Sequence, residues 1–208
     1  GRGDRPWPRV GCAMSTASVP TLHVEVHGDG PPLALWHGWG MNQRVFAPLV
    51  ERLAQRHRVI AVDLPGHGRS AWPVAAREFD DEVLAALIAT LPPGCGLLGW
   101  SMGATLALQA ALARPGRVRA LVLLHATPRF VAADDWSQGM APAVLAQFAR
   151  ALEVDYARTV SDFLDLQVRG SRDAPAGRDR EGGAPAGTPR VSRAASRSAW
   201  SRRPTSRP

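Results

Sequence analysis

Lysine is absent from this chain of 208 residues, and all 25 basic residues are arginine. Nine of the arginines lie in residues 171–208 beside only three acidic residues, so this segment carries +6 of the chain's formal charge of +7. A basic chain often binds nucleic acid or an anionic membrane. Because the charge is confined to one segment, we expect the folded part to bind neither nucleic acid nor membrane.

Cysteine and long apolar runs are also scarce. The two cysteines, Cys12 and Cys95, make no disulfide framework, and Cys95 falls in a predicted buried strand. No apolar run is long enough to span a membrane, and residues 1–13 lack the apolar segment of a secretory signal. No metal-ligand spacing or phosphate-binding glycine loop is present. We therefore expect a reduced cytoplasmic protein without metal or cofactor.

The composition divides the chain into four parts. Residues 171–208 contain no Leu, Ile, Phe or Met, and such a segment buries too little apolar surface to offset its ordering entropy. We predict a disordered extension over 1–20, an α/β core over 21–130, a partial helical lid over 131–170 and a disordered tail over 171–208. The abrupt change near Gly170 indicates a frameshift in a GC-rich gene, with an Arg-rich RNA-binding tail as the alternative. Met14 is the expected natural start.

Apolar runs alternate with segments of helical periodicity along the core. Strands are predicted at 21–26, Pro32–Trp36, Arg58–Val62, Cys95–Trp100 and Val118–Leu124. Helices are predicted at 43–55, at 83–91 after an Asp80 cap, and at 104–113. This alternation is typical of the α/β class, with a mostly parallel sheet and helices on both faces. Two amphipathic segments, 141–152 and 155–168, follow without a strand between them and predict a lid, entered through a solvated helix start at 134–136.

A serine between two glycines joins a predicted strand to a predicted helix. Gly99-Trp100-Ser101-Met102-Gly103 has the Gly-x-Ser-x-Gly pattern of a nucleophile elbow. The turn requires small residues two positions either side of the serine, because strand and helix nearly touch there. Its serine Oγ lies at a helix start, where backbone N–H groups favour a developing negative charge. Residues 37–40, 63–70 and 125–127 also follow predicted strands, so the active site is predicted at these carboxyl ends.

Several motifs together resemble the α/β-hydrolase superfamily and, within it, the BioH group, the pimeloyl-acyl-carrier-protein methyl ester esterases of biotin synthesis. They are the elbow, Trp36-His37-Gly38-Trp39-Gly40, Val62-Asp63-Leu64-Pro65-Gly66-His67-Gly68-Arg69-Ser70, Ala126-Thr127-Pro128-Arg129-Phe130 and Phe163-Leu164-Asp165-Leu166-Gln167. The resemblance implies that Ser101 is the nucleophile and that the backbone N–H groups of Trp39 and Met102 form the oxyanion hole. It also implies a substrate channel lined by Trp39, Phe163, Leu164, Asp165, Leu166 and Gln167.

The resemblance further implies a monomer whose partner is an acyl-carrier protein bearing a pimeloyl methyl ester. Arg158 occupies a position that faces the acidic carrier protein in this family, and Arg150 and Arg169 could add to it. Asp162 stands where another lid arginine is expected. This departure predicts weaker docking of the carrier protein.

The catalytic triad is the larger departure from the family pattern. Its members follow the order serine, acid, histidine, yet the last histidine here is His125, directly after the strand Val118–Leu124. The chain is therefore either an esterase for pimeloyl-acyl-carrier protein, a generic short-chain ester hydrolase, or an inactive remnant without the triad acid and histidine. His125 is the candidate for a substitute base, although a hydrogen-bonded loop histidine is the simpler interpretation. We expect little or no activity, and an apolar open edge at Val118–Leu124.

Overall fold

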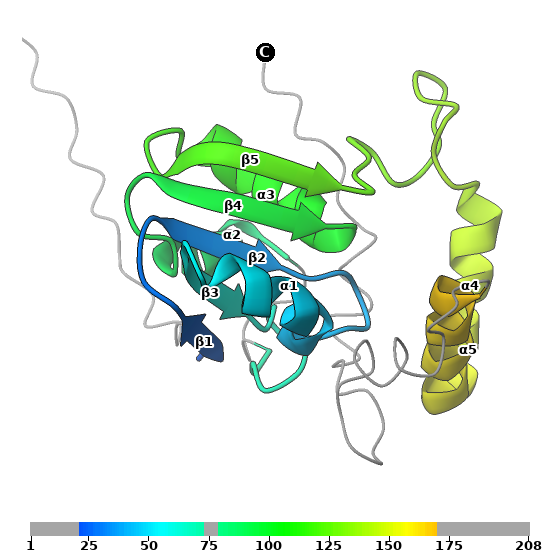
Figure 1. Cartoon of the computed structure of the whole chain (residues 1–208). Helices are drawn as coiled ribbons and strands as arrows, with labels where there is room; N and C mark the ends of the chain where they lie inside the picture. Colours follow the sequence, from blue (N-terminus) through cyan, green and yellow to red (C-terminus); the bar gives the residue numbers. More distant parts are fainter. Residues whose placement is uncertain (1–20, 73–78, 170–208) are drawn as a thin grey trace, which may run out of the picture.

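A five-stranded sheet forms the centre of the protein. The computed structural model describes residues 21–72 and 79–169, so the predictions for 1–20 and 171–208 lie outside the described residues. The strands run in the order β1-β3-β2-β4-β5, with β1 antiparallel to β3 and the other pairs parallel (Figure 1). Their bounds are β1 Val24–His27, β2 Pro32–Trp36, β3 Arg58–Val62, β4 Cys95–Trp100 and β5 Val118–Leu124. The predicted mostly parallel sheet is confirmed.

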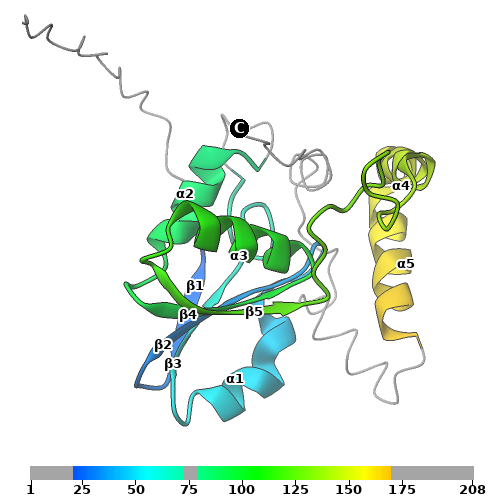
Figure 2. The ribbon, with the colours of Figure 1, turned by 90° about the horizontal axis from the view of Figure 1, so that it is seen from above.

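Helices cover both faces of the sheet, as the alternating pattern predicts. The short 3-10 helix η1 (Gln43–Phe46) continues into α1 (Ala47–Leu53) on one face, while α2 (Asp81–Ala89) and α3 (Met102–Ala113) lie on the other (Figure 2). The central strands bury side chains on both faces. Leu35 and Leu98 pack with Phe46 beneath α1, whereas Trp36 and Leu97 join the larger core on the α2 and α3 side.

Four predicted strands have the same first and last residues in the structure, but several other predicted boundaries differ from the observed ones. The first strand begins at Val24, where antiparallel pairing with Val62 starts. The predicted helix 43–55 is divided, because Pro48 lies in the first turn of α1 and has no N–H to donate. The Asp80 cap is confirmed, since its carboxylate accepts the Val83 N–H at 2.9 Å. Helix α3 begins at Met102, two residues before the predicted start, directly after Ser101.

The outer edge of the sheet is apolar and open. No strand of the described residues pairs with the outer side of β5, and Val122 and Leu124 keep 44% and 40% of their surface exposed. By contrast, β4 is almost wholly buried. The predicted open edge at β5 is thus confirmed for the part of the chain that the structure describes.

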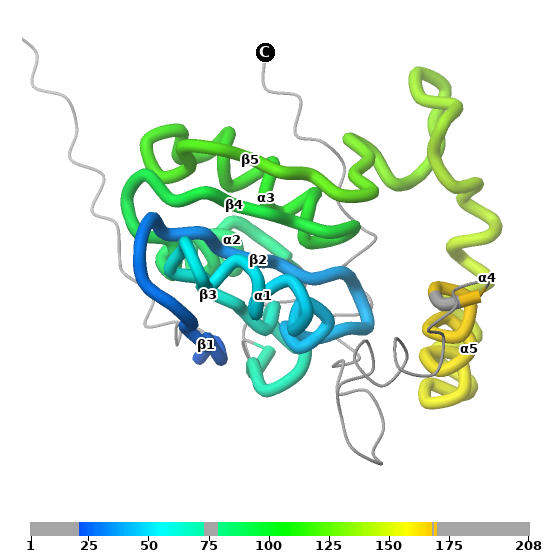
Figure 3. The backbone as a smooth tube through the Cα atoms, in the orientation of Figure 1, coloured from blue at the N-terminus to red at the C-terminus, as the bar shows by residue number. Residues whose placement is uncertain are grey.

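Two helices follow the sheet, α4 (Pro142–Val154) and α5 (Tyr156–Val168). They pack together beyond the carboxyl ends of β2, β4 and β5, and the backbone reaches them through the long connection after β5 (Figures 1 and 3). The predicted helix start at 134–136 is wrong: Ala133 and Trp136 exchange backbone hydrogen bonds of 2.9 and 2.8 Å across a turn. None of the helices in the described ranges is long and apolar enough to cross a membrane.

Candidate active site

Ser101 occupies the strained turn that its motif predicts. Its φ of 53° and ψ of −117° lie where residues other than glycine rarely fall. A Cβ on Gly99 would collide with the backbone of Gly103 and Ala104, and one on Gly103 would collide with the carbonyl oxygens of Trp36 and His37. The glycines are therefore required by the close approach of α3 to β4 and β2.

Backbone hydrogen bonds hold Ser101 in this conformation. Its N–H donates to the Leu124 carbonyl oxygen at 2.9 Å, and its own carbonyl oxygen accepts from the N–H groups of Ala104 and Thr105 at 2.9 and 3.1 Å. Within residues 21–72 and 79–169, no group forms a hydrogen bond with Ser101 Oγ. The N–H of Met102 opens α3, so no preceding helical turn supplies a carbonyl for it. Ser101 Oγ thus lies beside a helix N-terminus.

The turn after β2, residues 37–40, lies against this elbow and is called the His37 turn below. A Cβ built on Gly38 would be 3.4 Å from the Ser101 Cβ and 3.6 Å from the Trp100 carbonyl oxygen. His37 is completely buried; its Nδ1 lies 2.7 Å from the Gly38 carbonyl oxygen, and its Nε2 accepts the Leu64 N–H at 3.0 Å. Burial lowers the pKa of His37 to about 4, against the opposing effect of the Gly38 hydrogen bond. A neutral ring with both nitrogens bonded anchors the turn and is not available as a base.

The loop after β3 is a second buried support. The Asp63 carboxylate accepts the N–H groups of Gln43 and Arg69 at 2.8 and 2.9 Å. His67 is also completely buried, and its Nδ1 lies 3.0 Å from the Pro65 carbonyl oxygen. Burial, followed by the neighbouring His37, lowers the pKa of His67 to about 3. His67 therefore structures this loop as a neutral ring.

An aromatic cluster joins the His37 turn to the α4–α5 pair. The Trp39 ring meets Phe163 of α5 edge to face with centroids 5.0 Å apart, and Phe148 of α4 in the same way at 5.4 Å. Phe148 and Phe163 are themselves 5.9 Å apart. Phe148 is not among the site residues that the sequence predicts, because the apolar stripe of its helix indicates a buried face but does not identify what that face contacts.

The other residues of the predicted channel are not all brought to the site. Leu164 is buried within the core and Asp165 is partly buried. Leu166 is 58% exposed and Gln167 is exposed as well. Of the segment 163–167, the structure therefore places the Phe163 ring against Trp39 and leaves Leu166 and Gln167 at the surface.

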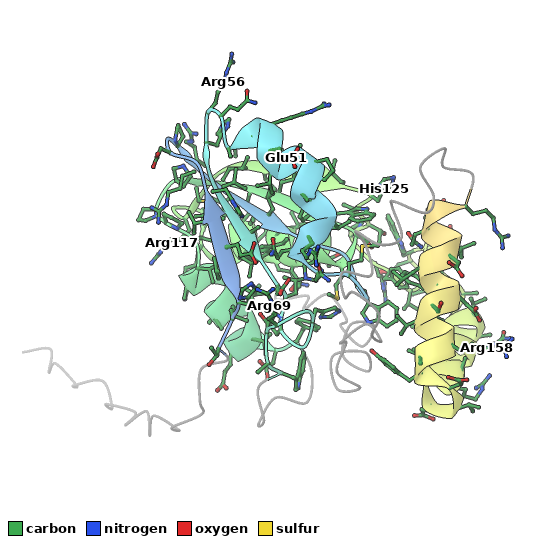
Figure 4. The ribbon with its side chains drawn as sticks, turned by 60° about the horizontal axis from the view of Figure 1, so that its bottom comes forward. Glu51, Arg56, Arg69, Arg117, His125 and Arg158 are labelled. Carbon is green, nitrogen blue, oxygen red and sulfur yellow. The ribbon has the colours of Figure 1, made fainter. Side chains whose placement is uncertain are left out.

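His125 and Arg158 lie at the surface, on different parts of the molecule (Figure 4). His125 directly follows β5 with a left-handed φ of 50°, and no hydrogen bond joins it to Ser101 within the described ranges. Arg158 projects from the outer side of α5, where its Nε lies 3.8 Å from Asp162 Oδ2. Arg150 and Arg169 are also exposed. Asp162 thus places a carboxylate beside the Arg158 guanidinium on the surface of α5.

The residues that the structure describes include no group of three or more His, Cys, Asp or Glu side chains placed to hold a metal ion. The described site consists of a serine on a strained turn, helix-start N–H groups and buried neutral histidines. Such an arrangement suits nucleophilic attack on a carbonyl carbon.

Comparison with known proteins agrees with this geometry. The model of the alpha/beta hydrolase fold family matches residues 31–204. The chain belongs to the alpha/beta hydrolase fold family.

Curated relatives of this hydrolase include the pimeloyl-[acyl-carrier protein] methyl ester esterase of Nitrosospira multiformis, 41% identical over 159 residues, and that of Aeromonas hydrophila, 45% identical over 156 residues. Each alignment covers 74% of this chain and 60% of the relative, so the chain spans about three-fifths of the length of these relatives. An esterase from Exiguobacterium antarcticum has a similar structure, with a TM-score of 0.65 and 27% identity over 71% of this chain and 57% of its own.

Proposed function

We propose that this chain carries the nucleophile and the oxyanion donors of a serine carboxylesterase, and that its substrate is the methyl ester of a pimeloyl group held on an acyl-carrier protein. The observation that carries the proposal is Ser101, strained at the start of α3 and packed against Gly38. The names of the relatives support the choice of substrate.

The proposed reaction has two steps. A base takes the proton of Ser101 Oγ, which attacks the ester carbonyl carbon, while the N–H groups of Trp39 and Met102 bind the resulting oxyanion. The bond to the methoxy oxygen then breaks, and methanol leaves with the proton. Water next attacks the acyl-serine, the carboxylic acid leaves, and Ser101 regains its proton. These bond changes require no cofactor.

The base is the open part of this proposal. His37 and His67 are buried and hydrogen-bonded with pKa values of about 4 and 3, so neither suits the task. His125 is the remaining candidate for a substitute base, because it directly follows Leu124, whose carbonyl oxygen accepts the Ser101 N–H. The second candidate function is acylation without turnover: the chain accepts an acyl group on Ser101 but does not release it by hydrolysis. It is favoured by the lack of any histidine in hydrogen-bond contact with Ser101 Oγ within the described residues.

We also propose that the α4–α5 pair is a lid on which the carrier protein docks. Arg158 keeps 78% of its side chain exposed on the outer side of α5, with Arg150 and Arg169 also at the surface. Arginine at such positions suits an acidic partner. Arg158→Ala should weaken carrier-protein binding in a salt-dependent way, whereas Asp162→Ala should strengthen it, because it removes the competing carboxylate.

Acylation by an activated ester tests the proposed function without depending on turnover. The p-nitrophenyl ester of monomethyl pimelate should place an acyl group on the peptide that contains Ser101, detected by mass spectrometry, and the Ser101→Ala protein should remain unmodified. Turnover should not exceed that of Ser101→Ala, because deacylation also needs a base. A folded protein that takes up no acyl group would contradict the proposal. A Ser101-dependent turnover that His125→Ala abolishes would instead establish His125 as the base.

A further inference from the structure

The His37 turn is held firmly on the side that faces the sheet. His37 Nε2 accepts the Leu64 N–H at 3.0 Å, and Gly38 packs against Ser101 so closely that a Cβ there would be 3.4 Å from the serine Cβ. A weak backbone bond of 3.4 Å from the Met41 N–H to the Gly38 carbonyl oxygen closes the turn. These contacts fix residues 37 and 38, but Trp39 and Gly40 extend beyond them.

The opposite side of the turn is covered by aromatic rings of the α4–α5 pair. Trp39, although 2% exposed, meets Phe163 and Phe148 edge to face at interplanar angles of 82° and 72°. Gly40 has a left-handed φ of 76°, and a Cβ built on it would lie 3.8 Å from two carbon atoms of the Phe163 ring. The residue that would supply an oxyanion N–H is thus held through its side chain by two separate helices.

We infer that Phe148 and Phe163 are positioning residues, which clamp the Trp39 indole and thereby aim the Trp39 N–H at the oxyanion. The inference rests on the proposed function, in which that N–H takes part. The inference extends the proposed function to Phe148, which lies on α4 and has no other assigned role.

Positioning and channel lining make different predictions for Phe148. A ring that only lines an acyl channel affects long acyl chains and leaves a two-carbon acyl group unaffected. A ring that positions an oxyanion donor affects every ester alike, because all esters develop the same charged oxygen and its stabilisation is sensitive to small displacements of the donor.

Hydrogen exchange of the full chain tests the clamp directly. Phe148→Ala and Phe163→Ala should each speed amide exchange in the peptide that covers residues 37–41 by about tenfold, because the outer side of the turn loses its cover. Val154→Ala is the matched control: it lies on the same helix as Phe148, is 87% exposed and should leave this exchange unchanged. Unchanged exchange in both phenylalanine variants, with their thermal unfolding still cooperative, would overturn the inference.

Acylation of Ser101 by two esters then separates positioning from lining. Both phenylalanine variants should lose about tenfold in the rate of acylation by p-nitrophenyl acetate, and a similar factor with the p-nitrophenyl ester of monomethyl pimelate. A loss confined to the longer ester would overturn the inference in favour of channel lining. If the parent chain takes up no acyl group while exchange still quickens in the variants, the proposed function fails but the clamp on the His37 turn stands.

Discussion

Two histidines follow strands on either side of Ser101, and their surroundings differ sharply. His37 directly follows β2, is completely buried and has hydrogen-bond partners for both ring nitrogens. His125 directly follows β5, is exposed and lies at the edge of the sheet that the described residues leave open. Both come from apolar strands of the same parallel sheet. The difference arises because, among the strands of the described residues, β2 has a neighbour on each side and β5 has one, so only the loop after β2 is enclosed by its neighbours.

The largest effect on stability should come from a glycine beside the enclosed loop after β2, which is called the enclosed side below; the region around β5 is called the open side. Gly103→Ala would push a Cβ into the carbonyl oxygens of Trp36 and His37, so α3 must move away from β2. We expect a loss of about 5 kcal/mol in the free energy of unfolding in urea. Gly116→Ala is the control near β5, where a Cβ meets nothing within 4 Å, and its unfolding free energy should change by less than about 0.5 kcal/mol. Equal losses in the two variants would show that the sides are equally packed.

Acid should weaken the enclosed side next. Burial lowers the pKa of His37 to about 4 and of His67 to about 3, from an ordinary value of 6.5. Below pH 6.5 these two rings bind protons in the unfolded chain but stay neutral in the folded chain. Stability therefore falls as the pH drops from 6.5 towards 4 and 3. Together the two rings should remove about 4 kcal/mol of unfolding free energy between pH 7 and pH 5.

Urea unfolding at a series of pH values would measure this loss, and an NMR titration would follow the two rings in the folded protein. His67→Phe should reduce the pH dependence by about half, since it removes one of the two buried rings. Ring signals of His37 or His67 that titrate near 6.5 in the folded protein would rule out this explanation.

Replacing each of the two histidines in turn by phenylalanine should give a smaller difference in unfolding free energy. His37→Phe leaves the Leu64 N–H and the Gly38 carbonyl oxygen buried without their ring partner, which should cost about 2 kcal/mol of unfolding free energy. His125→Phe, at an exposed position, should change it by less than about 0.5 kcal/mol. The two values come from the same urea titration. A larger loss for His125→Phe would mean that the loop after β5 is the better packed of the two.

The smallest expected effect is a gain in stability on the open side. His125 has a φ of 50°, a conformation that glycine adopts with less strain than histidine. His125→Gly should therefore raise the free energy of unfolding by about 1 kcal/mol, measured against the parent protein in urea. A decrease would show that the His125 ring makes contacts that outweigh the backbone strain.

Local pattern was sufficient for the parallel strands and for the elbow. Strands β2, β3, β4 and β5 lie where the sequence predicts them, because each apolar run ends at a polar residue: His37, Asp63, Ser101 and His125 follow the four strands. Boundaries that depend on pairing with another segment of the chain were predicted less accurately. Strand β1 begins where Val62 is available to pair, and the turn that includes Trp136 closes on Ala133 instead of opening a helix.

By itself the sequence determined the class of the fold and the place of Ser101, because Gly99, Ser101 and Gly103 satisfy a steric requirement within a few residues of chain. It could not determine what surrounds that serine. The tertiary structure alone brings Phe148 and Phe163 from two later helices onto Trp39, and it buries His37 while exposing His125. Those outcomes depend on which strands and helices become neighbours, which is a property of long-range packing that no local pattern encodes.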